Sequence, residues 1–154
     1  MTAVAAAVEI AGPLEYAEYG QRVRAAITDS VIVGLASFAL ILGLTAFASR
    51  GGPFAGILTS LAYLIDFAGA TIYYTVCNAE GGQTVGKLTT NTAVRVDGDE
   101  DRSLGYLRAF IRAVFPPFMW LLIIPGLLDV LWPLWDGKHQ SLHDKIVGSV
   151  VIRV

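Results

Sequence analysis

The stretch Arg22-Val-Arg-Ala-Ala-Ile-Thr-Asp29 opens the first long apolar run of the chain, and the run then continues without another charge as far as Ala48. Arg22 and Asp29 are seven residues apart, so in a helix they lie on one face, two turns from each other. A helix of this length and composition is typical of a membrane span. Because a carboxylate inside such a span is costly unless it is paired, we expect Asp29 to have a structural or functional role.

The composition of the whole chain also indicates a membrane protein. Of the 154 residues, 55% are hydrophobic and only 16% are charged, whereas a soluble domain carries about 25% charged residues. The net charge of −2 gives no reason to expect nucleic acid as a partner. We expect residues 1–19 to form an N-terminal tail and residues 20–154 one transmembrane domain. The tail has no Lys or Arg, so we do not expect a cleaved secretory signal.

Two full membrane spans are predicted, over about residues 23–48 and 54–77, with a Gly/Pro turn between them. In the first span, Ala26, Ser30 and Gly34 recur at every fourth position. Small residues at this spacing let helix backbones pack closely in lipid. We therefore expect this face to contact another membrane helix.

Asp66 lies in the middle of the second predicted span. A carboxylate at this depth is a candidate functional site by default, because its charge has no water to solvate it. It could carry a proton or bind a cation. Alternatively, it could be a protonated structural group that bonds Thr59, Tyr63 or a partner helix.

A third apolar stretch covers residues 113–135 and is broken by Pro116-Pro117, Pro125-Gly126 and Pro133. It could cross the membrane once as a tilted helix. Alternatively, it could form a hairpin of two short helices that turns at Pro125-Gly126, so that both of its ends lie on one side.

Two segments have the β-branched pattern of strands, at residues 89–96 and 148–154. A lone strand leaves its backbone groups unpaired, so we expect these two strands to pair. Pairing places the middle loop and the tail on one side of the membrane, which favours the hairpin. The predicted fold is an all-α membrane protein with about four membrane-embedded helices and a small two-stranded cytoplasmic β element.

The basic residues predict the orientation. Of the eleven Lys and Arg residues, the turn after the first span has only Arg50, whereas the middle loop and its flanks hold five. Basic residues accumulate on the cytoplasmic side of a membrane protein. We therefore expect a multi-pass protein of the cell (inner or plasma) membrane, with the N-terminus and the C-terminus both in the cytoplasm.

The middle motif Gly82-Gln83-Thr84-Val85-Gly86-Lys87 begins like a phosphate-binding loop, but Leu88 stands where a nucleotide site needs Ser or Thr. We expect no nucleotide here. The motif is instead predicted to be a tight turn at the membrane surface, with Lys87 facing lipid phosphates.

His139 and His143 are four residues apart, but no third ligand of matching geometry is evident, so we expect no metal. No cofactor motif and no nucleophile with a catalytic context is apparent in the sequence. We expect that the chain is not an enzyme.

Four motifs taken together resemble the RDD family of small membrane proteins. They are Arg22-x-x-Ala-x-x-x-Asp29, the middle Gly-Gln-Thr-x-Gly-Lys motif, a strand that ends in Asp97-Gly98, and a closing Leu-His-Asp144-x-x-x-Gly-x-x-Val. The resemblance covers about residues 20–154. Ser149 stands where the family more often has Thr. Arg22, Asp29 and Asp144 match the arginine and the two aspartates of the family.

The resemblance implies a function in membrane transport. Some RDD proteins are thought to exchange ions or protons, and others accompany larger transport systems, including lipid importers of the mammalian-cell-entry type. We expect membrane lipids as partners, together with other membrane subunits or further copies of this chain. Our hypothesis is an accessory or stabilising subunit in which Arg22, Asp29 and Asp144 form a structural polar network. The alternative is a self-associating cation or proton transporter that uses Asp66 and Asp29.

Overall fold

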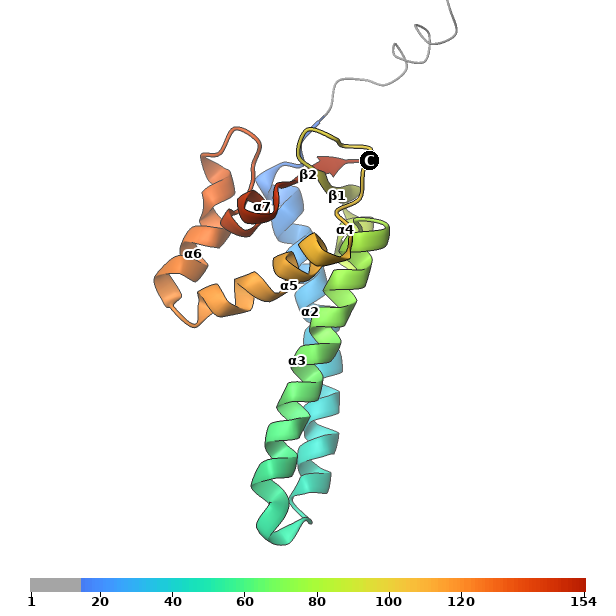
Figure 1. The fold of residues 1–154 in the computed structure, drawn as a ribbon, viewed down its shortest axis with the longest axis vertical. Helices are drawn as coiled ribbons and strands as arrows, with labels where there is room; N and C mark the ends of the chain where they lie inside the picture. Colours follow the sequence, from blue (N-terminus) through green and yellow to red (C-terminus); the bar gives the residue numbers. More distant parts are fainter. Residues whose placement is uncertain (1–14) are drawn as a thin grey trace, which may run out of the picture.

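A hairpin of two long helices dominates the computed structural model, which describes residues 15–154 (Figure 1). Helix α2 (Tyr19–Ala48) and helix α3 (Ala55–Glu80) are joined by the short 3-10 helix η1 (Gly52–Phe54). Both are long and apolar enough to cross a membrane. At about 1.5 Å per residue, each is longer than the roughly 30 Å hydrocarbon core of a bilayer. The two predicted spans are confirmed as helices of this kind, and most of the predicted tail lies outside the described residues.

The hairpin leaves most of its large apolar side chains uncovered. Leu35 is 66% exposed, Phe38 is 67% exposed and Leu64 is 62% exposed. Apolar surface on this scale is unfavourable in water, whereas lipid solvates it and leaves the helical backbone bonds intact. Ala26, Ser30 and Gly34 are also exposed, so the predicted packing face is not used to pack the two helices together.

A small cap lies at the end of the hairpin where α2 begins and α3 ends (Figure 1). Its sheet pairs β1 (Thr92–Val96) with β2 (Ser149–Arg153) in antiparallel register, with Val94 opposite Val151. The predicted pairing of these two segments is confirmed. The extended residues before α2 add one bridge, because Ala17 N–H donates to the Val151 carbonyl at 2.9 Å. Alanine, valine and leucine side chains form the buried core of the cap: Ala17, Ala79, Val94, Leu104, Ala109, Val147 and Val151.

The third apolar stretch does not form one span. It folds as α5 (Tyr106–Trp120) and α6 (Ile123–Leu131), followed by the 3-10 helix η2 (Trp132–Leu134). The chain turns at residues 121–122, between α5 and α6, so the predicted turn at Pro125-Gly126 is wrong. Pro125 is instead the third residue of α6, where the missing N–H has no partner within the helix in any case. At about 1.5 Å per residue, α5 and α6 are both too short to cross a bilayer alone.

Two further short helices complete the cap. Helix α4 (Val85–Thr89) follows α3 and leads into β1, and α7 (Leu142–Val147) leads into β2. Helix α4 packs on α2, and α7 packs on α5. The end of the hairpin is therefore covered by segments that are far apart in the sequence.

The fold predicts that the loop before α5 and the loop after η2 lie on the same side of a membrane. We expect Asp99→Cys and Gly137→Cys, each in a Cys77→Ala background, to react with a membrane-impermeant maleimide from one side of sealed vesicles. Ser49→Cys, at the tip of the hairpin, is expected to react only from the opposite side. If Gly137→Cys reacted from the same side as Ser49→Cys, the fold would be contradicted, because residues 106–134 would then cross the membrane.

Candidate functional site

Asp144 is the centre of the polar network at the end of the hairpin. Its side chain is completely buried, and it forms ion pairs with Arg22 of α2 and with Arg112 of α5, whose Nε lies 2.9 Å from Oδ1. The hydroxyls of Ser141 and Ser149 donate to the same carboxylate at 3.1 and 3.0 Å. The structure therefore brings Arg22 and Asp144 together, as the network hypothesis requires, and adds Arg112.

The local sequence positions Asp144 without help from distant segments. Ser141 and Asp144 form a reciprocal capping box at the start of α7, in which each side chain bonds the backbone of the other residue. The helix ends at Gly148, whose φ of +61° is in the left-handed region that glycine tolerates. The closing motif thus encodes one helical turn that holds a carboxylate in a fixed direction. At position 149, a Thr hydroxyl could make the same bond to Asp144 as this serine.

The ion pairs keep Asp144 charged. Burial raises the pKa of this carboxyl, but Arg112 and Arg22 outweigh burial, and the net pKa lies well below the usual range. Removal of either arginine would leave part of the buried negative charge of Asp144 without a counter-charge. Such a loss is strongly destabilising for a folded protein.

Asp29 belongs to a second cluster and does not bond Arg22. Its carboxylate accepts the Thr84 hydroxyl at 2.5 Å and the Gly86 N–H at 2.8 Å, and the Tyr73 hydroxyl lies 3.4 Å away. The expectation of one network that joins Arg22, Asp29 and Asp144 is therefore only half correct. The two residues share a face of α2, but two turns separate them, and each bonds a different segment of the cap.

The middle motif docks on Asp29. Thr84 is the N-cap of α4, so its hydroxyl accepts the Lys87 N–H while it donates to Asp29. Gly86 lies directly against α2, where a Cβ atom would overlap the Ala25 carbonyl and stand 2.8 Å from the Asp29 carboxyl carbon. Gln83 donates to the Thr92 carbonyl at 3.0 Å, and Gly82 (φ +69°) accepts the Val94 N–H at 2.7 Å. The motif is a turn that joins α2, α3 and β1.

Lys87 points into the protein, contrary to the expectation that it faces lipid phosphates at the surface. The residue is 9% exposed, and its Nζ donates to the Asn78 Oδ1 at 2.9 Å. Burial lowers the pKa of Lys87 to about 7, and Arg112 adds to this shift, whereas Asp29 and Asp144 oppose it. The sequence places this lysine beside a membrane span, but helix α4 turns it inward.

A third pair connects α6 to α7. The His143 ring nitrogen Nδ1 lies 2.7 Å from Asp129 Oδ2. The backbone N–H of His143 donates to the Oδ1 of the same carboxylate at 2.9 Å. Burial raises the pKa of Asp129, but the bonds from His143 outweigh it and hold that pKa below its usual range. His139 faces elsewhere, with its Nδ1 2.9 Å from the Pro133 carbonyl. Among residues 15–154, no group of three or more His, Cys, Asp or Glu side chains converges as a metal site would require.

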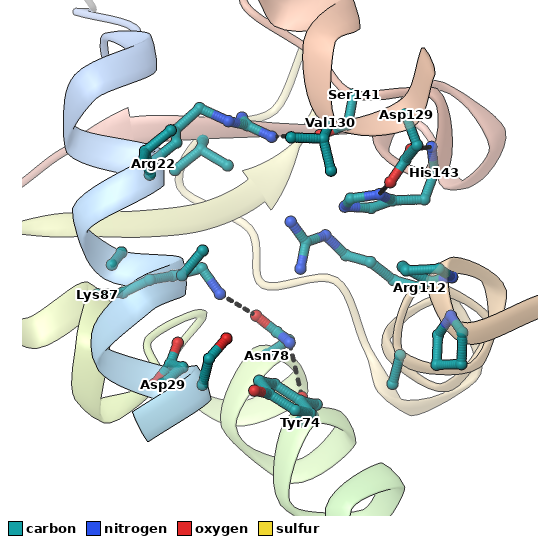
Figure 2. A pocket seen from close by; sticks show the side chains of 18 of the residues that line it. Arg22, Asp29, Tyr74, Asn78, Lys87, Arg112, Asp129, Val130, Ser141 and His143 are labelled. Carbon is teal, nitrogen blue, oxygen red and sulfur yellow. Dashed lines mark hydrogen bonds and ion pairs between the residues drawn. The ribbon is translucent and has the colours of Figure 1, made fainter. Parts of the chain in front are cut away.

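These clusters surround a cavity of about 440 Å³ between the hairpin and the α5–α6 unit. Figure 2 shows Lys87 bonded to Asn78, with the Arg112 guanidinium pointing into the same space. Arg22, Asp29, Asp129 and His143 also line it. Asp66 does not line this cavity and is half-buried in the middle of α3. The structure therefore separates Asp66 from the other charged residues that the sequence singled out.

Sequence reasoning missed several members of the site. In the sequence, Arg108 and Arg112 both resemble residues that face lipid headgroups. In the structure Arg108 is exposed, whereas the Arg112 side chain is only 10% exposed. A usable signal was present in α3, where Tyr73 and Asn78 are polar residues near the end of an apolar helix. Polar side chains in such positions indicate internal hydrogen bonding.

The sequence model described as the RDD family matches residues 16–148 of this chain. The match covers most of the chain and includes Arg22, Asp29 and Asp144. The chain belongs to the RDD family. Searches of curated proteins and of solved structures each found no match. In this RDD protein, the arginine and both aspartates of the motif are anchors between the membrane hairpin and the cap.

The close approach of Gly86 to α2 predicts a strong size limit at this position. We expect Gly86→Ala to destabilise the purified protein by about 1–3 kcal/mol, because backbone of α2 must move to admit the methyl group. Thermal unfolding in detergent measures the effect. Gly34→Ala is the matched control, because no atom lies within 4 Å of the added Cβ. Equal effects of the two substitutions would contradict the packing described.

The buried position of Lys87 predicts a pH dependence of stability. Between pH 7 and 10.5, the unfolded chain binds the lysine proton and the folded chain does not, so stability rises with pH. We expect the melting temperature to rise more between pH 7 and pH 9 in the native chain than in Lys87→Met. Lys145→Met is the control, because that lysine side chain is 41% exposed. A parallel pH profile for Lys87→Met and the native chain would show that the Lys87 pKa is not lowered.

Proposed function

We propose that this RDD protein is an accessory subunit that stabilises a larger membrane transport complex, such as a lipid importer of the mammalian-cell-entry type. One observation carries the proposal. The charged residues of the family motif form internal contacts in the cap, while the hairpin presents a small-residue face with no packing partner in the described part of the chain, where nothing lies within 4 Å of a Cβ on Gly34.

This division of roles fits a docking subunit. The cap holds the two long helices together at one end through these contacts, and their exposed faces remain available to other membrane helices. Small residues at every fourth position, such as Ala26, Ser30 and Gly34, permit the close backbone approach on which helix association in lipid depends. We further propose that the cap faces the cytoplasm and that both termini lie there, because basic residues are concentrated in it.

Exchange of a cation or a proton is the second candidate function. It is favoured by Lys87, a buried group that changes charge near neutral pH and lies in the same cavity as Asp29. Two long helices are few for an alternating-access machine, so this function requires several copies of the chain. The half-buried Asp66 would then lie between the long helices of neighbouring copies.

A gentle-detergent pull-down from native membranes tests the proposal. We expect the chain to recover integral membrane subunits of a transporter in fixed stoichiometry, as measured by mass spectrometry and native mass. Gly34→Leu is expected to reduce that recovery strongly, because the larger side chain blocks the small-residue face. Ala36→Leu is the matched control on an exposed part of the same helix.

Recovery of the chain alone, or only with copies of itself, would contradict the accessory role and favour ion exchange. In that case Asp66→Asn should abolish cation-dependent proton flux in proteoliposomes. The accessory role predicts no cation-dependent proton flux in the native chain or in Asp66→Asn.

A further inference from the structure

The cavity between the hairpin and the α5–α6 unit has two chemically different parts. One part is lined by the cationic side chains of Arg22, Lys87 and Arg112, which come from three different helices, and Figure 2 shows all three around one space. The rest is lined largely by small or apolar groups: Ala26, Phe67, Ala70, Pro116, Trp120 and Val130. Neither the docking face nor the ion pairs of the cap account for such a space.

The polar part has more hydrogen-bond donors than the protein uses. When protonated, Lys87 has three N–H donors, and one of them bonds Asn78, a neutral partner. Arg112 bonds Asp144 through Nε, although its side chain is only 10% exposed and carries four other N–H groups. Arg22 Nη1 is buried and has no hydrogen-bond partner. A buried donor such as Arg22 Nη1 requires an acceptor.

The neighbouring carboxylates already have partners. Asp144 accepts bonds from Arg22, Arg112, Ser141 and Ser149 and is fully buried. Asp29 accepts Thr84 and Gly86, and Asp129 accepts His143. Two guanidinium groups thus share one carboxylate, while Lys87 is paired only with an amide. The donors that remain in the cavity therefore lack an acceptor, and a compact anion would supply one.

The cavity lies at the depth of lipid headgroups. From Asp29 to Ala48 there are 20 residues of helix, which span about 30 Å, the thickness of the hydrocarbon core. With the turn at Ser49 at one surface of the bilayer, Asp29 and the cationic side chains beside it come to the other surface. The exposed residues Ala26 and Ser30 also line the cavity, so its apolar wall continues onto the membrane-facing side of α2.

We propose that this cavity binds the phosphate headgroup of an anionic phospholipid, with Arg22, Lys87 and Arg112 as its ligands and the acyl chains leaving along Ala26 and Ser30. Guanidinium groups pair with phosphate oxygens through two parallel bonds, and the ammonium adds a point charge. Cations from three directions suit the three terminal oxygens of a phosphate monoester. This inference goes beyond the accessory role and does not depend on any protein partner.

Purified full-length protein in neutral detergent tests the proposal by native mass spectrometry. We expect phosphatidic acid to bind in a 1:1 ratio and to be preferred over phosphatidylcholine with the same acyl chains. Lys87→Met should weaken the binding of phosphatidic acid about five-fold, the effect of one basic residue at a lipid surface. Inorganic phosphate alone is expected not to raise the melting temperature, whereas phosphatidic acid should raise it.

A second variant keeps the test decisive if Lys87→Met fails to fold. Ala26→Leu narrows the apolar wall without touching a charged group, and it should also weaken the binding of phosphatidic acid. Ala36→Leu, on the same helix but outside the cavity lining, should bind like the native chain. Equal binding of both lipids, or equal binding by the Ala26 and Ala36 variants, would overturn the proposal, as would stabilisation by inorganic phosphate equal to that by phosphatidic acid.

Discussion

The fully buried carboxylate of Asp144 is the constraint on which the cap depends. A charge in that position must be compensated, and its partners come from the start, the middle and the end of the chain: Arg22, Arg112, Ser141 and Ser149. Because an unpaired buried charge is strongly destabilising, the network opposes any arrangement that separates α2, α5 and α7. The network thus adds to the packing of α5 against α3 in holding the α5–α6 unit beside the hairpin.

Asp29 constrains the same helix in a different way. Its partners are a hydroxyl and a backbone N–H from the 82–87 motif, so it fixes the position of a turn rather than balancing a cation. The glycine at position 86 is needed because α4 lies directly on the backbone of α2. Arg22 and Asp29, two turns apart on one helix face, thus hold two separate segments of the cap against the membrane hairpin.

The functional proposals follow from this division between an ordered polar end and an apolar hairpin. The hairpin offers surface to lipid and to other helices, whereas the cap and the hairpin together line a cavity in which Arg22 Nη1 is buried without a partner. A docking role uses the first feature and lipid binding uses the second. The two roles share Ala26 and Ser30, which line the cavity, whereas Gly34 belongs to the small-residue face alone.

The sequence by itself determined the features that depend on local pattern. The lengths of apolar runs predicted α2 and α3, β-branched segments predicted the paired strands, and the motif residues identified Arg22 and Asp144 as network partners. Tertiary structure alone decided which group each charge meets. Arg112 and Lys87 look like surface cations in the sequence, yet the packing of α5 and α4 turns both inward, and Asp29 bonds a turn instead of an arginine. The reason is that hydropathy and periodicity are properties of neighbouring residues, whereas the partner of a buried charge is set by segments up to 122 positions away.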